Sequence, residues 1–264
     1  MNPSVLLQEG NAAAAIAQRD LMKLLRDRPR LITTLLFPLL FIGVLGGSLQ
    51  TNLGHSAGVN FLTLTFTGVL AQTLFQSASQ GLISLINDRE NDFSQEMFVA
   101  PISRYTIVVG KILGESLVAL PQGLTILVFG AIFLRPDAVQ LLMLMVASVL
   151  VSLFGGAFGV LVLANFASQQ TANQVFSFVM IPQYFLAGVF YPIKTMPPGL
   201  NLLSIVSPMR YAVDLARGLY YAGRPEYARI VLEPPLVDLA VLITLFTLFL
   251  VVGTALFVRG ERFR

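Results

Sequence analysis

Long, mostly uncharged apolar segments alternate along the chain with short segments that carry nearly all of its charged residues. The long segments are predicted to be membrane-spanning helices, because crossing the hydrocarbon core takes roughly 20 mostly apolar residues. The segments that fit are residues 31–49, 59–86, 105–134, 138–164, 173–191 and 236–258. Pro182 and Gln183 interrupt the fifth of them. The chain is therefore predicted to be an all-α, polytopic membrane protein with six transmembrane helices.

The N-terminal segment before the first span has an amphipathic pattern over residues 12–28. Its basic positions are Arg19, Lys23, Arg26 and Arg30, and its apolar positions are Ala14, Ala17, Leu21, Leu24 and Leu25. A basic amphipathic helix beside a span suits the anionic surface of a cytoplasmic leaflet. Pro29 ends the pattern and starts a new helix at a different angle. We expect residues 1–30 to be a cytoplasmic segment whose interfacial helix contacts membrane lipids, and not a cleavable signal peptide.

The short loops give the orientation of the spans. Basic residues precede the first span, surround the loop between the second and third spans, and end the chain. An even number of spans puts all of them on one side, which the positive-inside rule makes cytoplasmic. Both termini are therefore predicted to be cytoplasmic. Residues 31–258 would form the transmembrane domain and residues 259–264 a short cytoplasmic tail, in the cell (inner or plasma) membrane.

Composition narrows the chemistry further. Hydrophobic residues make up 55% of the 264 residues and charged residues 12%, too little polar surface to cover a soluble core. With no cysteine and one histidine, His55, disulfides and cysteine- or histidine-rich metal centres are excluded. There is no Walker A sequence, because Ile193 stands where a glycine must precede the lysine. We expect that the chain is not an enzyme, and that it has no catalytic residue, no metal, no cofactor of its own and no nucleic-acid partner.

The cytoplasmic loop at residues 87–104 reads NDRENDFSQEMFVAPISR. Phe93, Met97 and Phe98 form an apolar stripe on a short helix whose other face is charged. A solvated, charged loop helix is one interpretation. The other interpretation is that the apolar stripe docks into a groove of a partner protein, because phenylalanine and methionine side chains are not stabilised by exposure to water. Ser103 is placed to cap the helix that follows.

The predicted external stretch at residues 194–232 also carries structure. Ser207 and Pro208 have the pattern of an N-cap and first residue of a helix that runs to about Tyr221. Side chains that can pair across its turns are Arg210, Asp214 and Arg217. An ordinary surface loop is the alternative, but the apolar content favours two short re-entrant helices that dip back toward the membrane between spans five and six.

Polar side chains at membrane depth have two interpretations. In the second span, Thr65, Gln72, Gln76 and Ser79 fall on one helical face. Such groups either hydrogen-bond between helices or line a transport path. Glu115 lies near the cytoplasmic end of the third span. It either binds a proton or the substrate, or forms a bond to a neighbouring helix. In the fourth span, Ser148, Ser152, Gly155, Gly156 and Gly159 have a small-xxx-small spacing that permits close helix packing.

Three segments of this chain, in the same order, resemble the permease subunit of type-2 ABC exporters, the ABC-2 family. Residues 19–47 resemble its interfacial helix and first span, and residues 88–111, with the sequence EMFVAPISR, are similar to its first cytoplasmic loop. Residues 207–221, SPMRYAVDLARGLYY, resemble its external helix before the last span. The resemblance covers most of the chain. It departs at Asn91 and Asp92, where many relatives have an aromatic residue followed by glycine.

The resemblance implies that two permeases pair, as copies or paralogues, and that each docks on a separate ATP-binding cassette ATPase that holds Mg-ATP. It implies that the ATPase contacts Arg89, Glu90, Phe93, Glu96, Met97, Pro101 and Arg104. Arg19, Lys23 and Arg26 would anchor the interfacial helix. Pro208, Arg210, Tyr211, Asp214 and Arg217 would hold the external helices together at the exit. The substrate would be a small amphipathic molecule such as a drug or lipid, because polysaccharide-exporting relatives generally lack the EM-x-VAP-x-SR loop.

Other functions stay open on the sequence alone. A secondary transporter driven by an ion gradient needs intramembrane acids and an internal repeat of spans. Glu115 alone, without a visible repeat, argues against it. An ABC-2 exporter of polysaccharide or ions and a non-transporting membrane scaffold or receptor are further alternatives.

Overall fold

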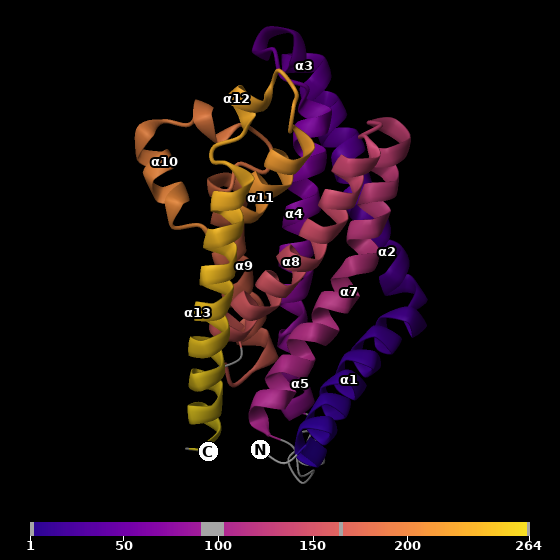
Figure 1. The fold of residues 1–264 in the computed structure, drawn as a ribbon, viewed down its shortest axis with the longest axis vertical. Coiled ribbons are helices and arrows are strands. Elements are labelled where there is room, and N and C mark those ends of the chain that lie inside the picture. Colours follow the sequence, from indigo (N-terminus) through magenta and orange to yellow (C-terminus); the bar gives the residue numbers. More distant parts are fainter. Residues whose placement is uncertain (1–2, 91–102, 164–165, 263–264) are drawn as a thin grey trace.

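The computed structural model describes residues 3–90, 103–163 and 166–262, and every element in these ranges is helical (Figure 1). The elements are α1 (Pro3–Arg26), α2 (Arg28–Leu40), the π-helical η1 (Phe41–Gly46), α3 (Gly47–Ala57), α4 (Phe61–Gly81), α5 (Ile83–Glu90), α7 (Arg104–Phe133), α8 (Ala138–Leu163), α9 (Gln169–Leu186), the 3₁₀ turn η2 (Ile193–Thr195), α10 (Pro198–Ile205), α11 (Pro208–Tyr220), α12 (Tyr227–Ile230) and α13 (Pro235–Arg262). The all-α prediction is confirmed.

Four helical stretches are long and apolar enough to cross a membrane: Arg28–Gly54, Arg104–Phe133, Ala138–Val162 and Pro235–Arg259. They correspond to the first, third, fourth and sixth predicted spans. The second and fifth predicted spans exist as α4 and α9, but neither is among these four stretches. Both carry amide side chains within their length, which lowers their hydropathy. The full count of six spans therefore stays a prediction.

Helix α4 lies at the centre of the bundle and packs against α7, α8 and α11. Two glycines of α8 let the backbones of α4 and α8 approach closely. A Cβ atom at Gly159 would lie 2.5 Å from the carbonyl oxygen of Ser79, and one at Gly155 would overlap that of Phe75. Ser79 Oγ also donates a hydrogen bond of 2.8 Å to the Gly155 carbonyl. The close packing predicted from the small residues of the fourth span is present.

Helix α1 begins earlier than predicted and packs along the first half of α7 (Figure 1). Gly110 and Gly114 of α7 permit this contact, because a Cβ at either would lie 3.1 Å from the backbone of Ala13 or Ala17. The buried face of α1 is centred on these alanines, whereas Leu25 is exposed. Of the apolar stripe predicted to lie on lipid, Ala17 and Leu24 therefore face protein, whereas Ala14 and Leu25 are exposed.

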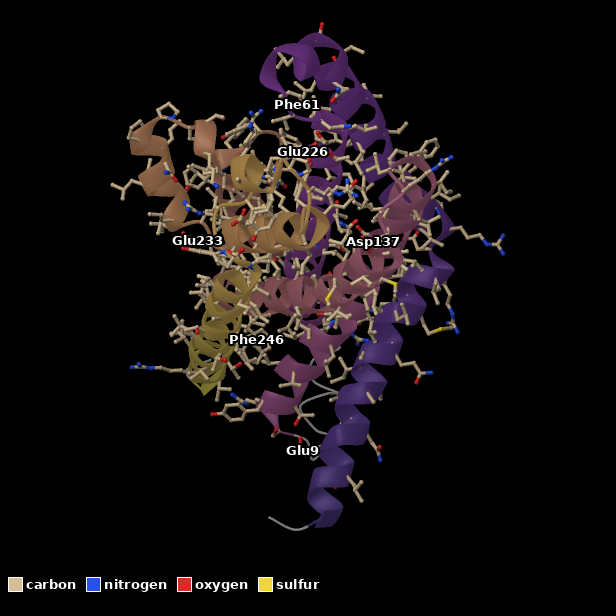
Figure 2. The ribbon with its side chains drawn as sticks, turned by 45° about the horizontal axis from the view of Figure 1, so that its top comes forward. Glu9, Phe61, Asp137, Glu226, Glu233 and Phe246 are labelled. Carbon is tan, nitrogen blue, oxygen red and sulfur yellow. The ribbon has the colours of Figure 1, made fainter. Side chains whose placement is uncertain are left out.

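The two ends of the chain lie at the same end of the bundle, and α3, α10, α11 and α12 gather at the opposite end (Figure 1). Glu9 marks the first end and Glu226 the second in Figure 2. The helix predicted to start at Pro208 is α11, and four apolar side chains along one of its faces, Met209, Val213, Ala216 and Tyr220, are buried. Ser103 caps α7 as predicted, since its Oγ accepts a bond of 3.1 Å from the Thr106 amide.

Candidate functional site

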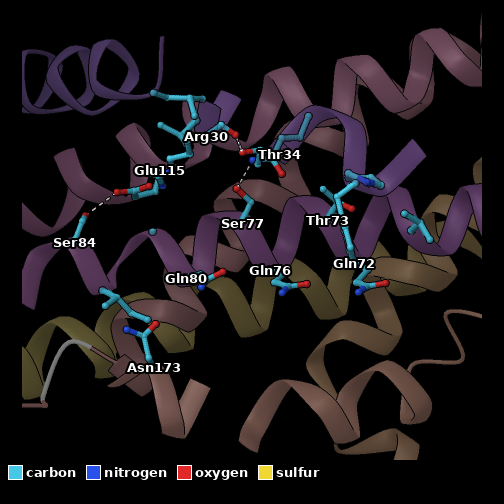
Figure 3. Close-up of a pocket in the computed structure, with 18 of the residues that line it drawn as sticks. Arg30, Thr34, Gln72, Thr73, Gln76, Ser77, Gln80, Ser84, Glu115 and Asn173 are labelled. Carbon is cyan, nitrogen blue, oxygen red and sulfur yellow. Dashed lines mark hydrogen bonds between the residues drawn. The ribbon is translucent and has the colours of Figure 1, made fainter. Parts of the chain in front are cut away.

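A groove of about 890 Å³ runs between α2, α4, α7 and α9 (Figure 3). Its α4 wall is built from amide and hydroxyl side chains that recur at helical spacing. They are Gln72, Thr73, Gln76, Ser77 and Gln80. Amides both donate and accept hydrogen bonds without carrying charge. The α4 wall therefore offers a neutral, hydrogen-bonding strip within an otherwise apolar bundle.

Only part of the predicted polar face of α4 reaches this groove. Gln72 and Gln76 line it, but Thr65 and Ser79 are completely buried elsewhere. Gly46 lets η1 pack over Thr65, and α8 packs over Ser79. Neighbouring helices thus cover the two ends of the predicted stripe. The groove instead follows the face of α4 that carries Gln72, Gln76 and Gln80.

Aromatic side chains line the groove from α2, η1 and the α9 region. Phe37 and Phe41 come from α2 and η1, and Tyr184, Phe185 and Phe190 come from α9 and the chain just after it. The rings of Phe41 and Phe190 lie 5.4 Å apart, centre to centre, and so join the two walls. Aromatic faces on one side and amides on the other suit a ligand that is itself amphipathic.

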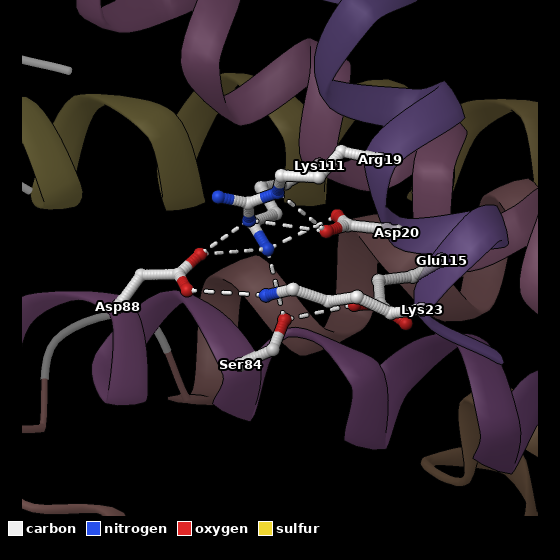
Figure 4. A network of polar contacts seen from close by, with 7 residues as sticks. All are labelled: Arg19, Asp20, Lys23, Ser84, Asp88, Lys111 and Glu115. Carbon is white, nitrogen blue, oxygen red and sulfur yellow. Dashed lines mark hydrogen bonds and ion pairs between the residues drawn. The ribbon is translucent and has the colours of Figure 1, made fainter. Parts of the chain in front are cut away.

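Charged side chains meet at the end of the groove nearest the chain termini (Figure 4). Lys111 of α7 has no exposed surface. Its ammonium lies 3.0 Å from Asp20 of α1 and 3.1 Å from Asp88 of α5. Arg19 bridges the same two carboxylates at 3.1 and 2.6 Å, and Lys23 lies 3.6 Å from Asp88. This charged cluster therefore ties together three helices, of which α5 leads into the segment predicted to contact the ATPase.

The charges of the cluster hold Asp88 ionised. Burial by itself would raise the pKa of Asp88, but the charge of Lys111 and the hydrogen bond from Arg19 lower it below its ordinary value. Lys111 also donates a hydrogen bond of 3.0 Å to Ser84 Oγ, and Ser84 Oγ donates one of 2.8 Å to Glu115 Oε1. One hydroxyl thus connects the charged cluster to a carboxylate in the groove wall.

Sequence reasoning did not single out Lys111 and Asp20. A lysine in an apolar span signals a buried partner, and helical spacing alone would offer Glu115, one turn away on the same helix. The structure instead pairs Lys111 with carboxylates of two other helices. Phe93, Glu96, Met97 and Pro101, together with the side chains of Arg89 and Glu90, lie outside the part of the chain that the structure describes. Arg104 is the first residue of α7.

Helix α11 is held by bonds to backbone groups. Arg217 Nη2 donates to the carbonyls of Gly188 and Val189 at 2.6 and 3.3 Å. Asp214 accepts from the amides of Leu232 and Glu233 at 3.0 and 2.9 Å. Complete burial lowers the pKa of Arg217 to about 10, so it stays charged at neutral pH.

Two further predicted residues tie α11 to α10. Arg210 donates to Ser204 Oγ and, at 3.3 Å, to the Asn201 carbonyl, while the Tyr211 hydroxyl donates to the Ile205 carbonyl at 3.0 Å. Pro208 begins α11. Among the residues that the structure describes, no ion pair within 4 Å joins Arg210, Asp214 and Arg217, although the charge of Asp214 still acts on Arg217. Each reaches a different neighbouring segment instead.

Comparison with known proteins agrees with this architecture. A family model described as ABC-2 type transporter matches residues 11–221. A putative transport permease of Cyanophora paradoxa is 26% identical over 215 residues, which cover 78% of this chain and 72% of that protein. An inner membrane transport permease of Escherichia coli is 25% identical over 193 residues, 70% of this chain and 72% of that protein. A probable multidrug ABC transporter permease of Escherichia coli is 27% identical over 139 residues, 52% of this chain and 38% of that protein.

Proposed function

This chain belongs to the ABC-2 type transporter family, whose members are transport permeases and not enzymes, and we propose that it moves small amphipathic molecules outward across the membrane. The observation that carries the proposal is the groove with amides along its α4 wall and aromatic rings from α2, η1 and the α9 region. A drug-sized molecule with polar and apolar sides fits a groove of this size and lining. The name of the multidrug permease among the relatives supports a drug as substrate.

The energy for transport would come from a separate ATP-binding cassette ATPase that binds Mg-ATP and contacts residues 88–104. The charged cluster supports this coupling, because Asp88 stands at the start of that loop and is bonded to α1 and α7 through Arg19 and Lys111. A displacement of the loop would therefore move α7, which forms part of the groove wall.

A second permease, identical or a paralogue, would complete the transport path. Exposed apolar side chains on α9 and α10 support such pairing. Phe178 of α9 is 81% exposed, and Leu202 of α10 is 69% exposed. We further propose an inner or plasma membrane location, cytoplasmic termini, contact of α1 with lipid head groups, and re-entrant positions for α10 and α11.

The test combines assembly with transport. The permease and its candidate ATPase are co-purified, and ATP-dependent uptake of the amphipathic dye Hoechst 33342 is measured in inside-out vesicles. Phe93→Ala with Glu96→Arg should abolish uptake while the permease stays folded in the membrane. Glu226→Arg with Tyr227→Ala, at the opposite end of the bundle, is the matched control. Unchanged uptake by the loop variant would rule out this coupling site.

A further inference from the structure

Glu115 is the acidic side chain that lies among the amides of the groove (Figure 3). It is 4% exposed and comes from α7, opposite the last turn of α4. A Cβ atom at Gly81 would overlap its carboxylate, so the glycine leaves the space that this side chain occupies. The other charged groups of the lining are Asp20, Lys23 and Arg30, at the end of the groove nearest the termini.

The neighbouring cations are engaged elsewhere or solvated. Lys111, on the same helix, faces the carboxylates of Asp20 and Asp88, and only the hydroxyl of Ser84 stands between it and Glu115. Arg30 of α2 is exposed at the mouth of the groove. Among the described side chains, Glu115 forms no ion pair within 4 Å. A carboxylate removed from water in this way is stabilised when a cation joins it.

The rest of the groove lining suits the uncharged part of an organic cation. From Gly81 to Gln72 the wall of α4 rises roughly 14 Å, at about 1.5 Å per residue. At its far end stand the rings of Phe41, Tyr184 and Phe190. A ligand with one positive group and an aromatic body would place its charge at Glu115 and its rings against these side chains.

We propose that Glu115 binds the positive group of the substrate, and that the molecules carried are lipophilic organic cations. This inference rests on the proposed export function, and it narrows the substrate class for the same groove. Ser84 would orient the carboxylate by its hydrogen bond, and the amides of Gln76 and Gln80 would hydrogen-bond to polar groups of the ligand.

The test uses two ions of nearly equal size and opposite charge. Binding of tetraphenylphosphonium and of tetraphenylborate is measured on the purified full-length permease in nanodiscs, with protein-free nanodiscs subtracted. The wild type should prefer the cation. Glu115→Gln should weaken cation binding by about tenfold or more, since a charge-assisted contact is lost, and should not weaken binding of the anion. Glu226→Gln removes the same charge far from the groove and should leave both affinities unchanged.

A conservative variant keeps the test decisive if the amide variant does not fold. Glu115→Asp retains the charge and should retain the preference for the cation. Equal affinity of Glu115→Gln and the wild type for tetraphenylphosphonium would overturn the proposal, and so would a wild type that does not distinguish the two ions. Neither measurement involves the ATPase. A failure here with intact ATPase assembly and dye uptake would therefore reject only the substrate class.

Discussion

Lys111 Nζ lies 3.1 Å from Asp88 Oδ2, and the lysine side chain is completely buried. The pair joins α7 to α5, the last described helix before residue 91. The same ammonium lies 3.0 Å from Asp20 of α1. One buried charge therefore fixes the relative positions of three helices at the end of the bundle where the ATPase is proposed to dock.

Lys111→Met should destabilise the permease by about 3–5 kcal/mol, because it removes the completely buried one of the two cations that Asp20 and Asp88 share. Equilibrium unfolding of the purified protein in mixed micelles measures this free energy. Lys23→Met is the matched control. Lys23 approaches the same Asp88 at 3.6 Å, but its side chain is 55% exposed, and an exposed pair contributes about 1 kcal/mol or less. Equal losses for the two variants would contradict the role given to burial.

Acid should weaken the same cluster through Asp88. The pKa of Asp88 is lowered in the folded protein from an ordinary 3.8, so its ionised form stabilises the fold above that value. The contribution is lost as the pH falls below 3.8 through the folded-state pKa. The difference in unfolding free energy between the wild type and Asp88→Asn should therefore be largest above pH 4 and should shrink below it. A difference that does not change with pH would contradict this assignment.

The contact of α4 with α8 should be sensitive to a single methyl group. Gly155→Ala places a Cβ against the backbone carbonyl of Phe75, and backbone cannot move aside as a flexible side chain can. Overpacking of this kind costs about 1–3 kcal/mol, which should appear as a lower thermal unfolding midpoint. Gly47→Ala is the control, because nothing lies within 4 Å of its added Cβ. A neutral Gly155→Ala would show that the two helices are not closely packed in the membrane.

Hydrophobic patterning and capping residues predicted most of the long helices of this protein, because an apolar stretch and a helix cap are local properties of the chain. The start of α11 after Ser207 and the cap of α7 at Ser103 are examples. The partners of Lys111 were not predictable in this way, since Asp20 and Asp88 come from helices distant in sequence. The groove position of Glu115 also depends on tertiary packing, because Gly81 on another helix provides the space for its carboxylate.

The predicted polar face of α4 shows the same limit. Helical spacing grouped Thr65 and Ser79 with the two glutamines that line the groove, but it contained no information about the neighbouring helices. Gly46 and Gly155 bring such neighbours over Thr65 and Ser79. The small residues that decide which polar groups stay accessible therefore lie on other helices, whose packing partners a single sequence does not reveal.

The end of the bundle opposite the termini depends on a buried cation of a different kind. Arg217 bonds through Nη2 to two carbonyls just after α9 and has no exposed surface. Its planar guanidinium presents several donors in fixed directions, which a lysine ammonium cannot reproduce. Arg217→Lys and Arg217→Met should therefore both release the chain after α9, although the first keeps the positive charge.

Hydrogen exchange of the purified permease measures this release segment by segment. Amides of residues 187–192 should exchange about 10- to 100-fold faster in both Arg217 variants, which corresponds to about 1.4–2.8 kcal/mol of lost local stability. Amides of α7, on the far side of α4, should be unaffected. Arg229→Gln, an exposed position on α12, is the control. Exchange at wild-type rates in Arg217→Lys would show that the positive charge alone holds the chain after α9 in place, and that the shape of the guanidinium does not matter.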